Sequence, residues 1–443
     1  MPLPIRISLN AGYLLVLAIA SPLLLWRAVR YGKYVDGWSE KFLGRLPLLR
    51  DSGDVAWFHA VSVGEVLQLE TIVPEFARSN PDATVLITTT TGTGLDVAKQ
   101  RFGDHHCCYF PLDFSWAIRR ALSRVQPRLV VLVELELWPM FICEASRVAE
   151  VAMINGRVSD NSFRGYSRVR FLIEPVLRRV SRIGAQTAEY GQRLKSLGAH
   201  DVEVTGSIKF DRVQTDRANP GTKQLRQLFG IDDGDLVLIA GSTQAGEEEL
   251  AVTAWQNLNR ELPQVRLVVV PRHKERFDEV AGYIESLGCK FVRRSRLVAG
   301  DVVPAGSVIL LDTLGELSSC WGLADVAFVG GSFGDRGGQN MIEPAAFGAA
   351  VVVGPNTSNF RDVVDELRQS DGIEIVESSE HFESSVKRLL VDGDRRRAMG
   401  RAAQECVLNH AGASKQTLAI LESLWGPKPE MHCDVDVERR VAC

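Results

Sequence analysis

The 443-residue sequence lacks most features that mark a metalloprotein or a disulfide-bonded protein. Its eight cysteines form no C-x-x-C pair and no regular spacing, so neither a disulfide framework nor a zinc site is expected. There is no H-E-x-x-H motif and no obvious carboxylate cluster, which predicts chemistry without a metal or a cofactor. A formal net charge of −4 gives no general reason to expect nucleic acid as a partner.

Long hydrophobic runs are also scarce, and the N-terminus holds the main one. Residues 11–26 (AGYLLVLAIASPLLLW) are apolar and uncharged, with more basic residues after them than before. Counted from Ile7, the run reaches the roughly 20 residues needed to span a bilayer. We therefore expect residues 1–35 to form a membrane anchor that leaves the remainder in the cytoplasm. A cleaved signal peptide and a helix lying on the membrane surface are the alternatives.

With 45% hydrophobic and 24% charged residues, the chain has the composition of a globular protein with room for two or three domains. From residue 55 onward, short apolar runs alternate with helical patterns, as in parallel α/β sheets. A polar stretch at 214–223 interrupts this pattern and is expected to be a linker. We therefore predict an α/β protein with doubly wound, Rossmann-like domains at 36–213 and 214–426, followed by a disordered tail at 427–443.

The strands of the first domain are expected at 55–59, 85–89, 129–133, 151–155, 183–186 and 202–205, with helices at 66–79, 114–125 and 189–197. Those of the second are expected at 236–241, 267–270, 308–311, 326–329 and 351–353, with helices between about 379 and 425. Ligands of open α/β sheets bind beyond the carboxyl ends of the strands. We therefore expect the two domains to face each other across a cleft.

The segment 326–348 (VAFVGGSFGDRGGQNMIEPAAFG) predicts a buried strand, a glycine-rich loop and a helix start in succession. Glycines let the backbone approach a ligand, and a helix N-terminus favours an anion. Asn340 and Glu343 share a helical face, where a carboxylate can accept hydrogen bonds from a ribose diol. The segment predicts a nucleotide site. An ordinary connection in which Glu343 caps the helix is the alternative.

Three charged side chains follow strands of the first domain. Glu65 lies where strand 55–59 passes into a helix, and it suits either a general base or a cap of its own helix. Glu134, favoured over its neighbour Glu136, leaves strand 129–133 and suits orientation of an acceptor or a cation. Lys209 follows the last strand and suits stabilisation of a leaving phosphate, with a plain surface lysine as the alternative.

Three strand exits of the second domain carry further candidates for a nucleotide site. The exit after strand 236–241 offers hydroxyls and amides to a phosphate. The exit after strand 267–270 offers a proline and two cation-capable side chains, and the exit after strand 308–311 offers a glycine turn into a helix. We expect these exits to converge with the segment 326–348 on one edge of the sheet. The candidates are Ser242, Thr243, Pro271, Arg272, His273, Gly315, Glu316 and Leu317.

The densest basic stretch lies between residues 157 and 182, interleaved with aromatic residues. Anionic lipid head groups suit it in a chain tethered to a membrane, whereas nucleic-acid binding and a solvated face are the alternatives. The stretch comprises Arg157, Phe163, Arg164, Tyr166, Arg168, Arg170, Phe171, Arg178, Arg179 and Arg182.

Six segments, in this order, resemble the lipid A-specific 3-deoxy-D-manno-octulosonic acid (Kdo) transferases. They are HAVSVGE at 59–65, ELELWP at 134–139, NGRVS at 155–159, TGSIKFD at 205–211, PRH at 271–273 and GGQNMIEP at 337–344. The resemblance reaches from the N-terminal anchor to about residue 359. It implies a GT-B glycosyltransferase that transfers Kdo from CMP-Kdo to a lipid A precursor on the cytoplasmic face of the inner membrane. The transfer would invert the anomeric centre without a metal.

The same resemblance implies roles for individual residues. Glu65 would be the general base, and Glu134 and Lys209 would stabilise the transition state. The CMP moiety would contact Pro271, Arg272, Gly315, Glu316, Leu317, Asn340, Met341, Ile342 and Glu343.

Two departures from the family pattern concern the donor side. Gln244 and Gln339 stand where the family usually has histidine, and glutamine can hydrogen-bond but cannot carry charge. Donor affinity or its pH dependence is therefore expected to differ. The competing hypotheses are a GT-B enzyme with another nucleotide sugar and a catalytically silent, membrane-tethered binding module. A dehydrogenase is disfavoured because no G-x-G-x-x-G follows the first strand.

Overall fold

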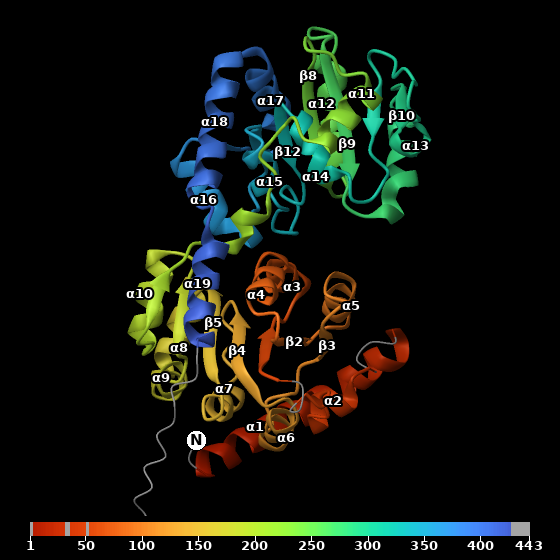
Figure 1. Ribbon diagram of the computed structural model, residues 1–443. Helices are drawn as coiled ribbons and strands as arrows, with labels where there is room; N and C mark the ends of the chain where they lie inside the picture. The colour runs from red at the N-terminus through yellow and green to blue at the C-terminus, as the bar shows by residue number, and fades with distance from the viewer. Residues whose placement is uncertain (1–2, 32–35, 50–52, 427–443) are drawn as a thin grey trace, which may run out of the picture. The chain divides into compact units, whose positions relative to one another are not determined.

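The computed structural model describes residues 3–31, 36–49 and 53–426 (Figure 1). The chain forms two compact units, Met1–Arg212 with Gly412–Cys443, and Val213–Ala411. The predicted disordered tail, 427–443, lies outside the described residues.

The N-terminal unit is built on a seven-stranded parallel sheet in the order β3-β2-β1-β4-β5-β6-β7. Apolar side chains of α3, α4, α5 and α19 cover one face, and those of α6, α7, α9 and α10 cover the other. The central strands are therefore almost wholly buried, as in parallel sheets covered on both faces. The strands are β1 Val55–His59, β2 Thr84–Thr89, β3 His106–Tyr109, β4 Pro127–Val133, β5 Glu150–Gly156, β6 Arg182–Ala185 and β7 Val202–Val204. The helices are α1 Leu3–Tyr31, α2 Trp38–Leu43, α3 Val63–Gln68, α4 Val73–Ser79, α5 Gly92–Arg101, α6 Ser115–Val125, α7 Pro139–Ala145, α8 Asp160–Arg168, α9 Arg170–Leu177, α10 Ala188–Leu197 and α19 Ala413–Trp425.

The second unit repeats this architecture with the strand order β10-β11-β9-β8-β12-β13-β14, again all parallel. Its strands are β8 Leu236–Thr243, β9 Val265–Pro271, β10 Phe291–Arg293, β11 Val308–Leu310, β12 Val326–Val329, β13 Ala350–Val353 and β14 Ile373–Ile375. Its helices are α11 Pro220–Phe229, α12 Glu247–Leu258, α13 Phe277–Ser286, α14 Leu317–Cys320, α15 Ile342–Ala346, α16 Arg361–Gln369, α17 Phe382–Val391 and α18 Gly393–Asn409. The predicted fold class, α/β with two Rossmann-like sheets, is confirmed.

Three strands were missed from the sequence, and each lies at the edge of its sheet: β3, β10 and β14. They are short and only partly buried, so they lack the apolar run that marks the central strands. The predicted linker 214–223 also needs correction. Helix α11 begins within it at Pro220, where the side chain of Asn219 caps the helix by accepting from Thr222 N at 2.9 Å.

The last helix, α19, belongs to the N-terminal unit, which corrects its predicted place in the second domain. Ala413 and Leu421 are buried in the N-terminal core, and the ring of Trp425 packs against that of Phe76. Figure 1 shows α19 beside the first sheet, in agreement with its contacts to β4, β5 and β6. Amphipathicity alone predicted the helix but could not say which core receives its apolar face.

We expect Leu421→Ala to destabilise the N-terminal unit by about 2–5 kcal/mol, because it removes a wholly buried side chain and leaves a cavity. Leu408→Ala, on the half-exposed face of α18, serves as the matched control and should change stability by about 0.5 kcal/mol at most. Hydrogen exchange during urea unfolding locates the effect. Loss of protection in β8 and β9 rather than in β4 and β5 would contradict the assignment.

Helix α1 packs on the N-terminal unit through polar contacts. Tyr13 donates to Asp113 at 3.0 Å, and Asn10 donates to Ser115 at 2.9 Å. Within the described parts of the chain, no helix combines the length and apolar character needed to cross a membrane. The prediction of a spanning anchor therefore lacks support, since the uncharged run is short and contains Pro22.

Candidate active site

Glu65 lies at the third position of α3, directly beyond the carboxyl end of β1. It forms a capping box with Ser62: Glu65 N donates to Ser62 Oγ at 3.3 Å, and Ser62 Oγ donates to Glu65 Oε1 at 2.7 Å. Val61 N donates to Glu65 Oε2 at 2.8 Å. Burial raises the pKa of Glu65, while the hydrogen bonds from Val61 and Ser62 oppose this rise. The carboxylate is thus oriented and partly buried, as a general base requires, and it also caps its helix.

Glu134 follows the carboxyl end of β4, and its side chain forms an ion pair with Lys209. Lys209 Nζ lies 3.3 Å from Glu134 Oε1, and Gln68 Nε2 donates to the same oxygen at 2.9 Å. The backbone of Glu134 adopts a left-handed conformation with φ of 61°, which is uncommon for a residue with a side chain. Such strain is typical of functional positions, so the turn that aims Glu134 supports a role for this carboxylate.

A buried amide network holds Gln68 in place. Asn155 Nδ2 donates to Gln68 Oε1 at 2.6 Å, and Asn155 Oδ1 accepts from Ile208 N at 3.2 Å. Asn155, at the end of β5, is wholly buried and has a φ of 55°. The network joins α3, β5 and the segment that carries Lys209, and it therefore positions the Glu134–Lys209 pair. In the sequence, only its motif marks Asn155, and the Asn-Gly pair within that motif is typical of a left-handed backbone position.

Glu136 lies near both of these carboxylates. Burial raises its pKa to about 7, and the charges of Glu65 and Glu134 add to the rise. The structure therefore brings Glu65, Glu134, Glu136 and Lys209 together at one edge of the sheet.

We expect Glu136→Gln to stabilise the protein more at pH 8 than at pH 5. The folded-state pKa of about 7 exceeds the ordinary 4.5, so the native protein binds this proton more tightly than the unfolded chain. Wild-type stability must then fall as the pH rises from 4.5 to about 7, and glutamine removes this loss because it does not titrate. Urea unfolding at both pH values measures the free energy of unfolding of the variant and the wild type. A difference between the two proteins that is the same at pH 5 and pH 8 would contradict the prediction.

In the C-terminal unit, the glycine-rich loop after β12 is held by a carboxylate. Glu247 accepts four backbone hydrogen bonds, from Gln244 N at 2.8 Å, Gly331 N at 2.6 Å, Ser332 N at 2.9 Å and Phe333 N at 3.0 Å. A Cβ at position 330 would lie 2.7 Å from Glu247 Oε2, so this close approach requires glycine. The amides of Gly331, Ser332 and Phe333 thus fix the start of the loop to α12.

Other residues predicted to bind the nucleotide lie at the carboxyl ends of β8 and β9. Ser242 has a left-handed backbone with φ of 52° and a partly exposed side chain. Thr243 is buried and donates to Glu248 Oε1 at 2.9 Å, so its hydroxyl already has a partner. Pro271 ends β9 within the core, whereas Arg272 and His273 are exposed beyond it.

The remaining candidates for the nucleotide site follow β11 and β12. Glu316 stands at the N-cap position of the short helix α14, after the left-handed Gly315, and its carboxylate pairs with Arg294 at 2.7 Å. Asn340 donates to Glu343 Oε1 at 3.0 Å and accepts from Ile342 N at 3.1 Å. Leu317 is partly buried, whereas the side chains of Met341 and Ile342 lie in the core, so that these two could offer a ligand only their backbone.

Comparisons with known proteins agree with this architecture. The family model "3-Deoxy-D-manno-octulosonic-acid transferase (kdotransferase)" matches residues 36–212. The Haemophilus influenzae 3-deoxy-D-manno-octulosonic acid transferase is 33% identical over 83% of this chain and 86% of its own. The Bordetella pertussis enzyme of the same name is 35% identical over 84% and 87%.

Among solved structures, the UDP-GlcNAc 2-epimerase of Neisseria meningitidis bound to UDP-GlcNAc aligns with a TM-score of 0.57 at 16% identity. The match covers 84% of this chain and 100% of the epimerase, and it shows the common two-sheet fold alone. The two transferases match at an identity and coverage that show common membership. The chain therefore belongs to the family of 3-deoxy-D-manno-octulosonic acid transferases, which are glycosyltransferases.

Proposed function

We propose that the protein transfers Kdo from CMP-Kdo to a lipid A precursor, lipid IVA, by inverting displacement in lipopolysaccharide core biosynthesis. Family membership supports the sugar. The observation that carries the catalytic part is the cluster of Glu65, Glu134, Glu136 and Lys209 at the carboxyl edge of the N-terminal sheet. Carboxylates with raised pKa values beside a cation are typical of sites that move a proton and stabilise charge.

In the proposed reaction, the Glu65 carboxylate takes the proton of an acceptor hydroxyl. The hydroxyl oxygen attacks the anomeric carbon of Kdo from the face opposite the leaving group, so the configuration inverts. The bond between this carbon and the CMP phosphate oxygen breaks, and its electron pair leaves with CMP. Glu134 and Lys209, held 3.3 Å apart, orient the reacting groups and stabilise the charge that develops.

We assign donor binding to the exits of β8, β9, β11 and β12. Arg272 and His273 are exposed there and suit the phosphate and the base edge. Asn340 and Glu343 form one hydrogen-bonded pair, which suits a ribose diol. Because Glu247 accepts from the amides of Gly331, Ser332 and Phe333, these three amides are not available to the donor phosphate. The chemistry assigned to these residues requires neither a metal nor a cofactor.

We also propose that the protein works at the cytoplasmic face of the inner membrane, with α1 lying on the bilayer surface. Exposed apolar side chains on α1 support this location: Ile7, Leu14, Leu15, Val16 and Ile19. In the basic stretch, Phe171 is 73% exposed, whereas Arg170 and Arg178 pair with Glu174. Flotation with anionic vesicles tests this location, and Ile19→Glu should weaken it; no flotation of the wild type would contradict it.

Donor competition separates the proposal from its rivals. Titration with CMP and CMP-Kdo should quench tryptophan fluorescence at concentrations far below those needed for uridine or guanosine diphosphate sugars. Preference for one of the latter would favour another GT-B transferase. Donor binding without turnover would favour a catalytically silent module.

A further inference from the structure

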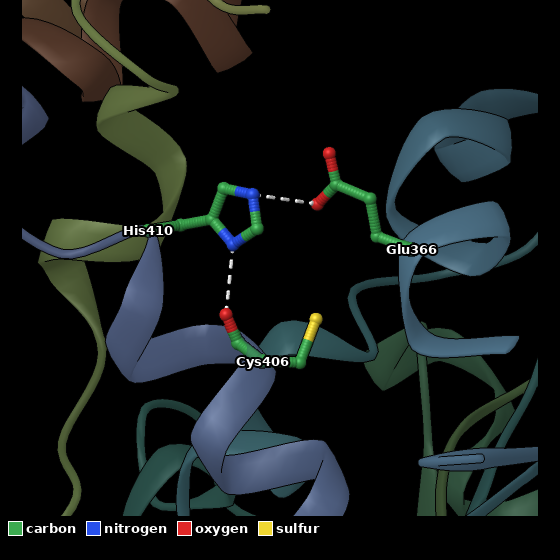
Figure 2. A group of neighbouring side chains, drawn as sticks. All are labelled: Glu366, Cys406 and His410. Carbon is green, nitrogen blue, oxygen red and sulfur yellow. Dashed lines mark hydrogen bonds and ion pairs between the residues drawn. The ribbon is translucent and has the colours of Figure 1, made fainter. Parts of the chain in front are cut away.

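A cluster of three potential metal ligands lies in the C-terminal unit, outside the residues assigned to catalysis or donor binding. Cys406 lies on α18, His410 caps the C-terminus of that helix, and Glu366 lies on α16. One ligand atom from each lies within 4.8 Å of the others. Figure 2 shows the imidazole, the thiol and the carboxylate facing a common space.

The histidine is oriented as in many metal sites. Its Nδ1 lies 2.8 Å from the backbone oxygen of Cys406, which can only accept, so Nδ1 must carry the hydrogen. This bond directs Nε2 toward Glu366. A ring nitrogen fixed by a backbone carbonyl, with the other nitrogen directed at the ion, is the usual arrangement of a ligating histidine.

The spacing and the distances suit a tetrahedral ion. Cys406 and His410 are four residues apart, on one face of the helix. In a tetrahedral site, metal bonds of about 2.0–2.1 Å place a nitrogen ligand and an oxygen ligand about 3.3 Å apart. His410 Nε2 and Glu366 Oε2 lie 3.2 Å apart. The thiol would need to approach by about 1 Å to complete a typical bond of about 2.3 Å.

Without a metal, His410 and Glu366 form an ion pair. Hydrogen bonding to Cys406, and next to Glu366, raises the pKa of His410 to about 10, so the imidazole is charged at neutral pH. A divalent ion would replace this proton between Nε2 and Oε2 and recruit the sulfur.

We propose that Glu366, Cys406 and His410 bind a divalent transition metal, with zinc as the best match, and water as the fourth ligand. Thiolate, imidazole and carboxylate together suit zinc rather than magnesium or calcium. The ion would fix the end of α18 to α16 directly before residue 412, where the chain returns to the N-terminal unit. The role is structural, and it is independent of the proposed transfer chemistry. Sequence spacing did not suggest it because Glu366 lies far from the other two ligands.

Cobalt titration of the chelator-treated, full-length protein tests the site. Cys433 and Cys443 should first be replaced by serine, because they lie outside the described residues and also bind soft metals. We expect one equivalent of Co²⁺ to bind with the near-ultraviolet absorption of a cobalt–thiolate bond and the visible bands of a tetrahedral ion. Saturating Zn²⁺ should displace it and raise the unfolding midpoint by about 5 °C.

Matched variants distinguish this site from adventitious binding. Because loss of a direct ligand costs more than loss of a supporting group, Cys406→Ser should weaken binding at least about 100-fold and remove the thiolate band. His410→Gln and Glu366→Gln should weaken binding similarly. Cys289→Ser, a partly exposed cysteine of the same unit, should change nothing. Absence of the thiolate band in the parent protein, or its persistence in Cys406→Ser, would overturn the proposal and leave only the ion pair.

Discussion

Glu65→Gln is expected to lower kcat for Kdo transfer by about 10³-fold while the protein stays folded and its KM for the donor changes little. Glutamine matches glutamate in shape and can hydrogen-bond Val61 N and Ser62, so the capping box persists. What it cannot do is accept the acceptor's proton. Steady-state kinetics together with a thermal unfolding curve measures both effects.

Ser62→Ala is the reciprocal control, because it removes the cap partner and keeps the carboxylate. We expect it to lose about 1 kcal/mol of stability and to retain most of the activity. If Glu65 serves only as a helix cap, the two variants will resemble each other, with a stability loss and near-normal turnover. That outcome would remove Glu65 from the chemistry.

Glu247→Ala is expected to destabilise the C-terminal unit by about 3–5 kcal/mol. The carboxylate is 3% exposed and satisfies four backbone N–H groups, three of them in the glycine-rich loop. Alanine would leave these donors without an acceptor in a buried place. Guanidinium unfolding measures the loss.

Glu249→Ala is the matched control, since Glu249 lies in the same first helical turn but is exposed. Both changes remove one negative charge from the N-terminus of α12, so the general effect on the helix dipole cancels in the comparison. A similar small loss in both variants would contradict the account of the loop.

The central architecture could be predicted because buried parallel strands need continuous apolar runs, as in β4 and β9. Edge strands such as β10 and β14 need no such run, and they were missed. The destination of α19 was also wrong, because an apolar helix face does not specify which of two similar cores it covers.

For the candidate site, the carboxyl ends of strands indicated Glu65, Glu134 and Lys209 one by one, and the structure adds that the last two form an ion pair. Local sequence could not choose between cap and base for Glu65, because S-x-x-E serves both. It also could not find Glu247, whose loop partners lie 84 to 86 residues along the chain. Such contacts depend on which strands become neighbours.

Mass analysis of the acceptor tests the central claim most directly. The purified protein is incubated with CMP-Kdo and a tetra-acylated disaccharide bisphosphate lipid, alongside the Glu65→Gln variant. The account predicts that the lipid gains the mass of one or more Kdo units with the wild type and almost none with the variant. An unshifted lipid, under conditions in which a known Kdo transferase modifies it, would contradict the proposed function.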